Sequence, residues 1–411
     1  MKSLAAASQR LPAAKAPGFV DLLPGQARRR RELEQAMLGT FSAWGYELVN
    51  TPAVEQLATI GLGVEPEQLR RLFKFADGDG TMLAMVGERT VPVARLAAGQ
   101  LRQAPRPLRL CYLGPTYQGH PAAGGQREAF QAGAELVGAH SATADAEVVA
   151  MAVGALEAGG AGDFQVEVGH VGFFGGLVAG LAPGQRGQVV DALAGRDLVE
   201  LEQALAGTDL GAAERELLLR FPALRGDAGI LTAAAGLVDN ATSALALEEL
   251  GAVHRLLQAH GVEARVNIDL GAVRDFDYYT GVVFEVFAPG LGAPLATGGR
   301  YDNLLQRFGE PEPATGLVVF LDRLQAVLDP ISASPAFVLV GYVDDAEAAE
   351  AAVGVAAGLR SGGEVVAMEV APIDDARLRA RAAATGASGA VICDGAGAWR
   401  LGPDGARERL K

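Results

Sequence analysis

The chain has 411 residues, of which 50% are hydrophobic and 20% charged, so it can form two or three domains with buried cores. Acidic residues outnumber basic ones by 49 to 35, and the formal net charge is −14. Because a surface that neutralises nucleic-acid phosphates needs clustered Lys and Arg, this balance argues against a nucleic-acid partner. No run approaches 18 consecutive apolar residues, and we expect a soluble, cytoplasmic protein.

The two cysteines, Cys111 and Cys393, lie far apart, each inside an apolar strand-like run. This placement favours buried thiols in a reducing compartment over a disulfide or a metal pair. The five histidines show no spacing typical of zinc ligands. We therefore predict no metal site.

At the N-terminus, residues 1–16 are rich in alanine and irregular, and we expect a poorly ordered arm. From Gln26 to Ser42 the charges come early and the apolar residues late, which predicts a helix leading into a core. The run Arg28–Arg31 could bind nucleic acid. Glu32 and Glu34 favour the alternative, a solvated first turn whose charges are compensated.

Several segments that follow predict an antiparallel sheet. Tyr46–Asn50 alternates and ends before Pro52, as a strand does. Leu72–Phe75 and Met82–Val86 flank a turn that contains Asp-Gly, and this predicts a hairpin. Arg109–Tyr117 and Ala129–Val137 form a second pair of predicted strands.

Residues 172–262 show helical spacing and predict a helical insertion, with helices over Val189–Leu205, Ala212–Phe221 and Thr242–Gln258. Strands are predicted again at Arg265–Leu270, Val282–Phe287 and Gly316–Phe320, the last running into a helix at Leu321. After a linker at 329–335, residues 336–411 alternate between strands and helices, which predicts a small α/β domain. Its strands are expected at Phe337–Val343, Glu364–Val370 and Ala390–Cys393, and its helices at Ala346–Leu359 and Asp375–Ala384.

Five motifs carry a resemblance to a known family. The segment from Arg274 to Glu285 closely resembles the Arg-Gly-Leu-x-Tyr-Tyr-Thr-Gly-x-x-Phe-Glu signature of histidyl-tRNA synthetases, and Gly298–Leu304 resembles their second histidine-binding signature. Trp44–Pro52 resembles class II motif 1. Leu113–Tyr117 and Gln131–Gly138 together resemble motif 2, and Ala314–Gly316 and Leu321–Leu324 together resemble motif 3. The resemblance implies an α+β fold over residues 17–330, a class II synthetase-like antiparallel sheet flanked by helices.

The resemblance breaks where an amino acid would be activated. The family has an arginine at the end of the first motif 2 strand, in a Phe-Arg-x-Glu pattern, where this chain has Tyr117-Gln118-Gly119-His120. A positioned cation must stabilise the charge that develops on the α-phosphate, and losing one such donor costs ~3–4 kcal/mol. Gln118 therefore marks a lost synthetase position, and we predict no catalytic residues. Arg323 leaves weak nucleotide binding open, beside a structural role at a helix start.

The amino-acid pocket, in contrast, is retained. By resemblance, Glu88 and Thr90 hold a ligand ammonium, and Gln131 and Glu135 share one face of a strand because side chains at even spacing do so. The resemblance also assigns Tyr278 and Tyr279 to the wall and Arg274 to the ligand carboxylate. We expect these seven residues to bind L-histidine.

A synthetase-like fold with a histidine pocket but no activation chemistry resembles the regulatory subunits of ATP phosphoribosyltransferase, which assemble with its short-form catalytic subunit in the first step of histidine biosynthesis. Val168–Gly172 also resembles a Gly-His-Val stretch of that class, although His170 alone suits a strand end equally well. The resemblance implies histidine as feedback inhibitor, no cofactor on this chain, no tRNA, and a homodimer within a hetero-oligomer. Phosphoribosyl pyrophosphate and magnesium would belong to the partner.

Two alternatives remain open: an active histidyl-tRNA synthetase with an altered motif 2, and a histidine sensor for another partner. The tail, residues 336–411, resembles a shortened anticodon-binding domain. It carries eight basic against eleven acidic residues, a poor surface for RNA, and we expect a relic or an assembly surface.

Overall fold

The computed structural model describes residues 15–120, 125–195, 197–271, 279–328, 336–402 and 404–410. The chain divides into two compact units, Met1–Asp329 and Pro330–Lys411. Almost all of the arm expected at residues 1–16 lies outside the described residues. Within the described ranges, no helix is both long enough and apolar enough to cross a membrane.

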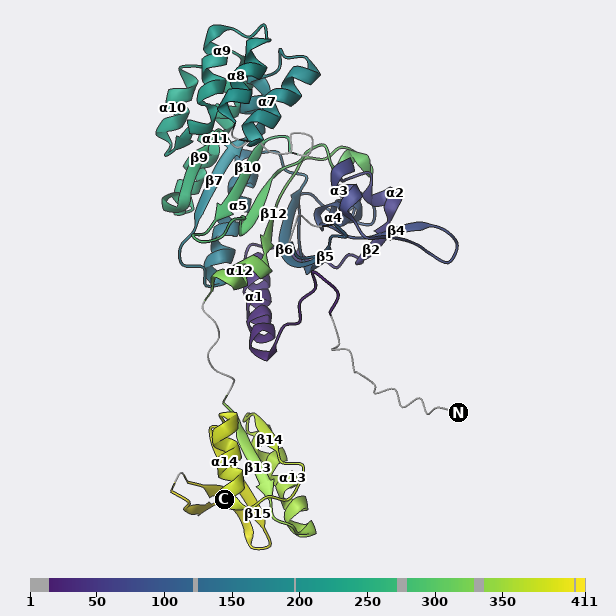
Figure 1. The fold of residues 1–411 in the computed structure, drawn as a ribbon, viewed down its shortest axis with the longest axis vertical. Helices are drawn as coiled ribbons and strands as arrows, with labels where there is room; N and C mark the ends of the chain where they lie inside the picture. Colours follow the sequence, from purple (N-terminus) through teal and green to yellow (C-terminus); the bar gives the residue numbers. More distant parts are fainter. Residues whose placement is uncertain are drawn as a thin grey trace, which may run out of the picture. The chain divides into compact units, whose positions relative to one another are not determined.

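A nine-stranded sheet forms the centre of the first unit (Figure 1). In spatial order its strands are β1 (Glu47–Leu48), β5 (Leu108–Tyr117), β6 (Glu128–Val137), β12 (Ala314–Phe320), β11 (Ala296–Arg300), β10 (Val282–Phe287), β7 (Gln165–His170), β9 (Val266–Asp269) and β8 (Arg225–Gly226). All neighbours are antiparallel except β1 with β5 and β7 with β9. The fold is α+β and class II synthetase-like.

One face of the sheet is covered by three helices, α1 (Pro24–Ala43), α5 (Ala142–Ala158) and α12 (Leu321–Val327), which form a large apolar core with it. No element was predicted over α5. Its sequence is almost uniformly apolar and its side chains are mostly buried, so it lacks the polar face that reveals an amphipathic helix. The predicted helix Gln26–Ser42 is confirmed as α1.

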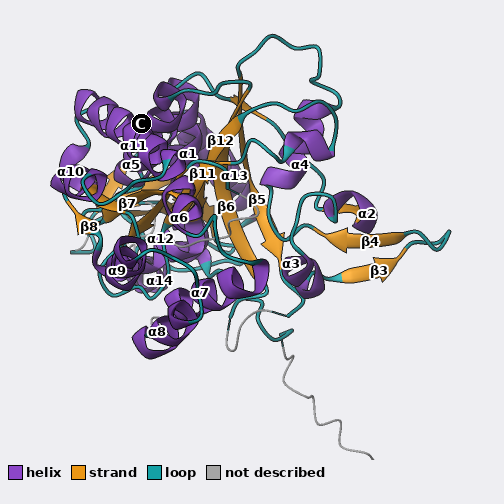
Figure 2. Ribbon diagram, turned by 90° about the horizontal axis from the view of Figure 1, so that it is seen from above, coloured by secondary structure: helices purple, strands orange, loops and turns teal. Residues whose placement is uncertain are grey.

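The other face of the sheet carries a smaller apolar core. Against it pack α4 (Thr90–Ala98) and a three-stranded sheet of β2 (Val54–Gln56), β4 (Met82–Met85) and β3 (Lys74–Ala76), with α2 (Leu57–Ile60) and α3 (Pro66–Arg71) nearby. The predicted hairpin is confirmed as β3 and β4, which project from the unit in Figure 2. This arrangement leaves space over the middle of the large sheet, where the candidate site lies.

The segment expected to be a helical insertion contains α6 (Val171–Leu177), α7 (Pro183–Gly195), α8 (Leu198–Ala206), α9 (Ala212–Arg220), α10 (Gly229–Ala235) and α11 (Ala241–Ala259). The single helix predicted over Val189–Leu205 is wrong, because α7 and α8 are separate helices. Asp197 begins the second one, since its carboxylate accepts hydrogen bonds from the amides of Val199 and Glu200 at 2.9 and 3.0 Å.

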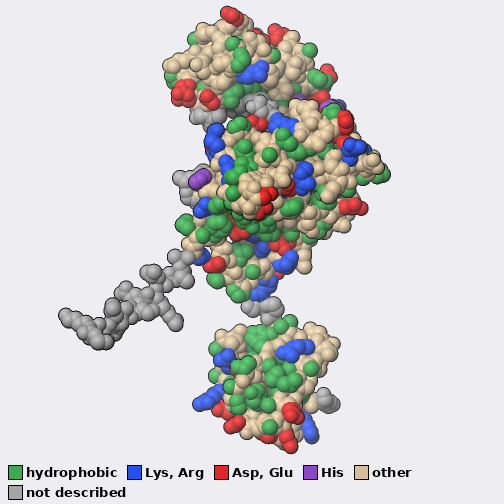
Figure 3. Space-filling model, turned by 90° about the vertical axis from the view of Figure 1, so that its right-hand side faces the viewer, with side chains coloured by type: hydrophobic (Ala, Val, Ile, Leu, Met, Phe, Trp, Pro, Cys, Tyr) green, Lys and Arg blue, Asp and Glu red, His purple; other side chains and the backbone are tan. Residues whose placement is uncertain are grey.

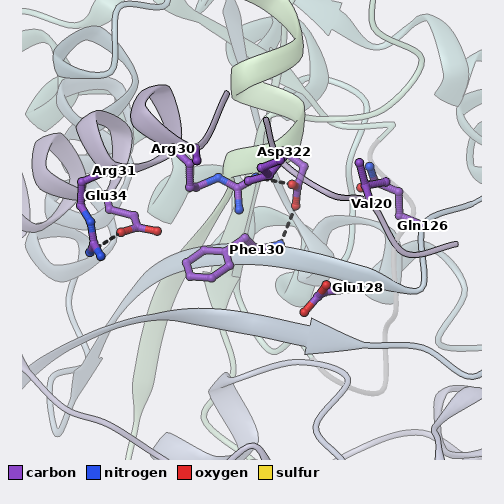
Figure 4. A pocket seen from close by; sticks show the side chains of 10 residues that line it. Val20, Arg30, Arg31, Glu34, Gln126, Glu128, Phe130 and Asp322 are labelled. Atoms are coloured by element: carbon purple, nitrogen blue, oxygen red, sulfur yellow. Dashed lines mark hydrogen bonds and ion pairs between the residues drawn. The ribbon is translucent and has the colours of Figure 1, made fainter. Parts of the chain in front are cut away.

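The prediction that Arg28–Arg31 form a solvated first turn is wrong for Arg30 (Figure 4). Its side chain is buried, ion-paired with Asp322 at the start of α12, and lies 4.9 Å from the ring centre of Phe130. Arg31 does pair with Glu34 at 2.7 Å, as charge compensation predicts. These groups line a cavity of about 300 Å³ between α1 and β6, but most of their charges are already paired with each other.

The second unit is a small α/β fold. Its sheet has the order β14 (Val366–Met368), β13 (Val338–Tyr342), β15 (Gly389–Asp394), β16 (Gly397–Leu401) and β17 (Arg407–Arg409), with helices α13 (Ala346–Ser361) and α14 (Asp375–Thr385). The three predicted strands and two predicted helices are present, whereas β16 and β17 were not predicted. Cys111 and Cys393 are both buried free thiols, as expected.

Candidate functional site

A cavity of about 380 Å³ lies on the sheet face that carries the smaller core. Its floor comes from the central strands and its wall from the segments around residues 63–72 and 87–90. It is lined by Gly63, Val64, Gln68, Arg71, Leu72, Gly87, Glu88, Thr90, Tyr112, Gln118, Gln131, Tyr279, Thr297, Val318, Phe320 and Arg323. Four of the seven predicted histidine-binding residues therefore meet in one hollow: Glu88, Thr90, Gln131 and Tyr279.

Glu88 is positioned by the helix that follows it. Its carboxylate accepts hydrogen bonds from the amides of Thr90 and Val91, each at 2.9 Å, at the N-terminus of α4. Burial raises the pKa of Glu88, and these two amides work against the rise. Each carboxylate oxygen keeps a lone pair for a further donor, so Glu88 can also accept from an ammonium group at the cavity wall.

The floor depends on glycine at position 316 of β12. Gln131, Gly133 and Glu135 share one face of β6, and Glu135 lies opposite Gly316 of β12. A Cβ atom at Gly316 would lie 1.8 Å from Oε2 of Glu135. Only glycine leaves room for this carboxylate between the two strands.

Glu135 differs from its predicted place in the cavity wall. It is buried beside the cavity without lining it, and its carboxylate accepts a hydrogen bond from the hydroxyl of Tyr301. Burial raises the pKa of Glu135 to about 8, and the Tyr301 hydroxyl offsets only part of that rise. Glu135 is therefore largely protonated at neutral pH.

Two tyrosines that matter here were missed by the sequence analysis. Tyr301 follows β11 inside the second signature, and Tyr112 of β5 lies across from Gly133. Both are buried in the smaller core. The period of two along β5 would place Tyr112 on the face of Leu110, but only the register between β5 and β6 places it beside Gln131.

Gln118 lines the cavity as the lost-position interpretation expects, and its side chain is an uncharged amide. Arg323 also lines the cavity, but its guanidinium donates to the carbonyl of Pro294 at 2.7 Å and stacks on Phe320 at 4.0 Å. Arg71 is ion-paired with Glu67 at 3.2 Å. The cations near Gln118 are thus engaged in contacts of their own.

The likeness of this chain to known proteins agrees with the geometry. Residues 18–324 match the family model described as histidyl-tRNA synthetase. A protein of Moorella thermoacetica named ATP phosphoribosyltransferase regulatory subunit is 40% identical over 379 residues, 92% of this chain and 97% of that protein. A protein of Rubrobacter xylanophilus with the same name is 42% identical, covering 82% of this chain and 81% of its own.

The chain belongs to the ATP phosphoribosyltransferase regulatory subunit family. A crystal structure from Bacillus halodurans, described as an ATP phosphoribosyltransferase regulatory subunit/histidyl-tRNA synthetase, has a TM-score of 0.84 at 30% identity and covers 93% of this chain and 98% of its own. The histidyl-tRNA synthetase of Nostoc, at 22% identity and a TM-score of 0.78, shares the fold. Membership of this family agrees with a synthetase-like fold in which an amide, Gln118, stands where motif 2 of the synthetases has an arginine.

Three other residues singled out in the sequence of this family member are Arg274, Tyr278 and His170. Arg274 and Tyr278 lie outside the described residues. His170 caps α6: its Nδ1 accepts from the amide of Gly172 at 3.0 Å, which leaves Nε2 to donate to Glu249 at 2.8 Å. Its role is thus structural. Among the described residues, no group of three His, Cys, Asp or Glu side chains could hold a metal ion.

Proposed function

We propose that this chain is the non-catalytic regulatory subunit of ATP phosphoribosyltransferase, required for the activity of the short catalytic subunit and responsible for feedback inhibition by L-histidine. One observation carries the proposal. The same cavity offers Glu88, Thr90 and Gln131 to an amino acid and an uncharged Gln118 where adenylate chemistry needs a cation.

The energetic argument concerns the developing charge on a phosphate. Removing one preorganised donor costs about 3–4 kcal/mol of transition-state stabilisation, a rate loss of several hundredfold. The Arg323 guanidinium cannot replace the missing arginine without leaving Pro294 and Phe320. The end of the cavity at Glu88 still suits an amino acid, because the Glu88 carboxylate can accept hydrogen bonds from its ammonium group.

Histidine must bind one state of the complex more tightly than the other in order to inhibit it. We place L-histidine in this cavity with Glu88, Thr90, Gln131 and Tyr279 around it and Glu135 behind the floor, and extend the site to Arg274 and Tyr278. The partner is the short-form catalytic subunit, and the chain acts as a homodimer within a hetero-oligomer in the cytoplasm. We propose that the C-terminal unit, about residues 336–411, is a relic of the anticodon-binding domain or an assembly surface.

We propose that tRNA is not a partner. On the face drawn in Figure 3, basic side chains are scattered among acidic and apolar ones and do not form a continuous stripe. With a formal net charge of −14, counterion release would contribute little to RNA binding.

Reconstitution tests the proposal. The chain is mixed with a short-form catalytic subunit, and phosphoribosyl-ATP formation is followed with and without histidine. We expect activity only in the mixture, inhibited by histidine. A Glu88→Gln variant should still activate the partner but lose the histidine response, whereas Glu32→Gln on the exposed side of α1 should behave as wild type. No gain on mixing would contradict the proposal, and histidine-dependent pyrophosphate exchange by this chain alone would favour the synthetase alternative.

A further inference from the structure

A second cavity lies on the opposite face of the large sheet from the candidate histidine site. It measures about 300 Å³, and its lining comes from the segment before α1, from α1 itself, from β6 and from the start of α12. Neighbouring residues face the two cavities in turn. Phe130 and Asp322 line the second cavity, whereas Gln131 and Arg323 line the first. The two cavities are therefore distinct sites on the two sides of the same strand.

The outer wall of the second cavity is held in place without a ligand. Val20 and Leu22 form this wall, in the segment that precedes α1. The amide of Arg127 donates to the carbonyl of Gly18 at 2.8 Å, and the Arg127 guanidinium lies 4.4 Å from the ring centre of Phe73. Gly18 has a φ of +82°, and a Cβ atom there would lie 2.5 Å from Cγ of Arg127. Because the wall is already ordered, a ligand that binds against it loses little affinity to ordering it.

The cavity offers apolar surface to a ligand. Val20 is 53% exposed and Leu22 is 38% exposed, so part of each hydrophobic side chain remains uncovered. Ala27 and the ring of Phe130 add further apolar surface to the lining. Covering these side chains with an apolar part of a ligand is favourable, since it removes their surface from water.

The charged side chains of the cavity leave one carboxylate without a cation. Arg30 is ion-paired with Asp322, and Arg31 is ion-paired with Glu34 at 2.7 Å. Glu128 lines the same cavity, and Figure 4 shows no interaction between it and the other labelled side chains. Two arginines and three carboxylates give the lining a formal charge of −1. The cavity therefore favours a cation over an anion.

Glu128 is able to accept from a further donor. Among the described residues, its hydrogen-bonding partner is the hydroxyl of Tyr117, which lies opposite it across β5 and β6. Burial and the Glu128 carboxylate both raise the pKa of Tyr117, so this hydroxyl stays protonated and donates. A carboxylate has about four lone-pair positions, and a single hydroxyl occupies one of them. The other positions can receive the N–H groups of a guanidinium or an ammonium ion.

We propose that this cavity is a second binding site, which takes a small organic cation: a guanidinium or ammonium group on an apolar stem. The cation pairs with Glu128, and the stem covers Val20, Leu22 and Phe130. A volume of about 300 Å³ lies at the small end of the range for ligand pockets and suits such a group. The site goes beyond the proposed function and does not depend on it.

The test is calorimetric titration of butylguanidinium, and of the uncharged butylurea of the same shape, into the full chain. We expect butylguanidinium to bind with a dissociation constant of about 1 mM, and butylurea at least roughly tenfold more weakly. The Glu88 carboxylate of the first cavity also attracts cations, so the titration is repeated with saturating L-histidine and with Glu88→Gln. Butylguanidinium should bind equally well in both. Loss of its binding in either case would place the probe in the first cavity and overturn the inference.

The same cation can be part of a free metabolite or of an arginine or lysine side chain of a partner protein. Where the short catalytic subunit forms a complex with this chain, butylguanidinium is titrated into that complex. Unchanged binding supports the site as one for a free cation. Loss of binding supports it as one for a basic side chain of the catalytic subunit.

Glu128→Gln removes the charge and keeps the shape of the side chain. We expect it to weaken butylguanidinium binding roughly tenfold and to leave butylurea binding unchanged. The matched control is Glu32→Gln on α1, which does not line the cavity and should bind the cation as wild type does. Equal affinity of Glu128→Gln and wild type for butylguanidinium overturns the inference and leaves the proposed histidine site untouched. If Glu128→Gln does not fold, wild type decides, since equal binding of butylguanidinium and butylurea also overturns it.

Discussion

The hydroxyl of Tyr301 donates a hydrogen bond to the buried carboxyl group of Glu135, which lies 166 residues earlier in the chain. This contact joins the segment after β11 to the centre of β6. It ties the segment that resembles the second histidine signature to β6, the strand that carries Gln131 on the cavity floor.

The Glu135 carboxyl group should make stability depend on pH. Its pKa is raised from 4.5 to about 8 in the folded protein, so the folded state holds a proton that the unfolded chain loses near 4.5. The resulting stabilisation is complete below about pH 4.5 and is lost as pH rises toward 8, at up to about 1.4 kcal/mol per pH unit. Urea unfolding at pH 5.5 and 8 should show Glu135→Gln losing less stability than wild type over this interval. An identical loss in both proteins would contradict the raised pKa.

Glycine at position 316 should be essential for folding the site. A Cβ atom there would lie 1.8 Å from Oε2 of Glu135 and 2.8 Å from the carbonyl of Ala134. We expect Gly316→Ala to lower the unfolding free energy by about 1–3 kcal/mol and to abolish histidine binding. The control is Gly187→Ala inside α7, where nothing lies within 4 Å, and which should raise stability by up to about 1 kcal/mol. Denaturant unfolding and calorimetry distinguish the two.

The Arg30–Asp322 ion pair should contribute more to stability than the exposed ion pair of the neighbouring Arg29 on α1. The Arg30 side chain is 9% exposed, and Asp322 also accepts from the amide of Phe130 at 2.5 Å. Removing Arg30 leaves the partly buried Asp322 carboxylate without its cation, and we expect Arg30→Ala to cost about 3 kcal/mol. Arg29→Ala, whose partner Glu32 is 48% exposed, should cost less than about 1 kcal/mol. Equal losses in denaturant unfolding would show that Arg30 is as solvated as its neighbours.

Glu88 should recognise the ammonium group of the ligand. We expect Glu88→Gln to weaken L-histidine binding roughly tenfold or more, because a charge-assisted hydrogen bond becomes a neutral one. Imidazolepropionate has no ammonium group, so its weaker binding should change little in the same variant. Calorimetry with both ligands measures the difference. A parallel loss for both would indicate that the variant had instead disturbed the start of α4, where Glu88 accepts from two amides.

The sequence by itself determined the elements whose residues alternate or carry a turn signal. The pairs β3–β4 and β5–β6, the strand β10 and the helix α1 have the predicted type and nearly the predicted bounds. It also determined that position 118 holds an amide and that position 88 holds a carboxylate, because chemical identity needs no coordinates. The fold class and the kind of ligand were implied by the motifs that resemble those of histidyl-tRNA synthetases.

Only the tertiary structure decided which side chains meet. Tyr112 and Tyr301 reach the site through strand register and through a contact across 166 residues, and neither leaves a periodic trace in the sequence. The burial of Arg30 depends on a helix that begins nearly 300 residues later, at Leu321. Periodicity assigns a residue to a face of its own helix or strand. The contribution of that residue to the free energy of unfolding depends on which other parts of the folded chain pack against that face.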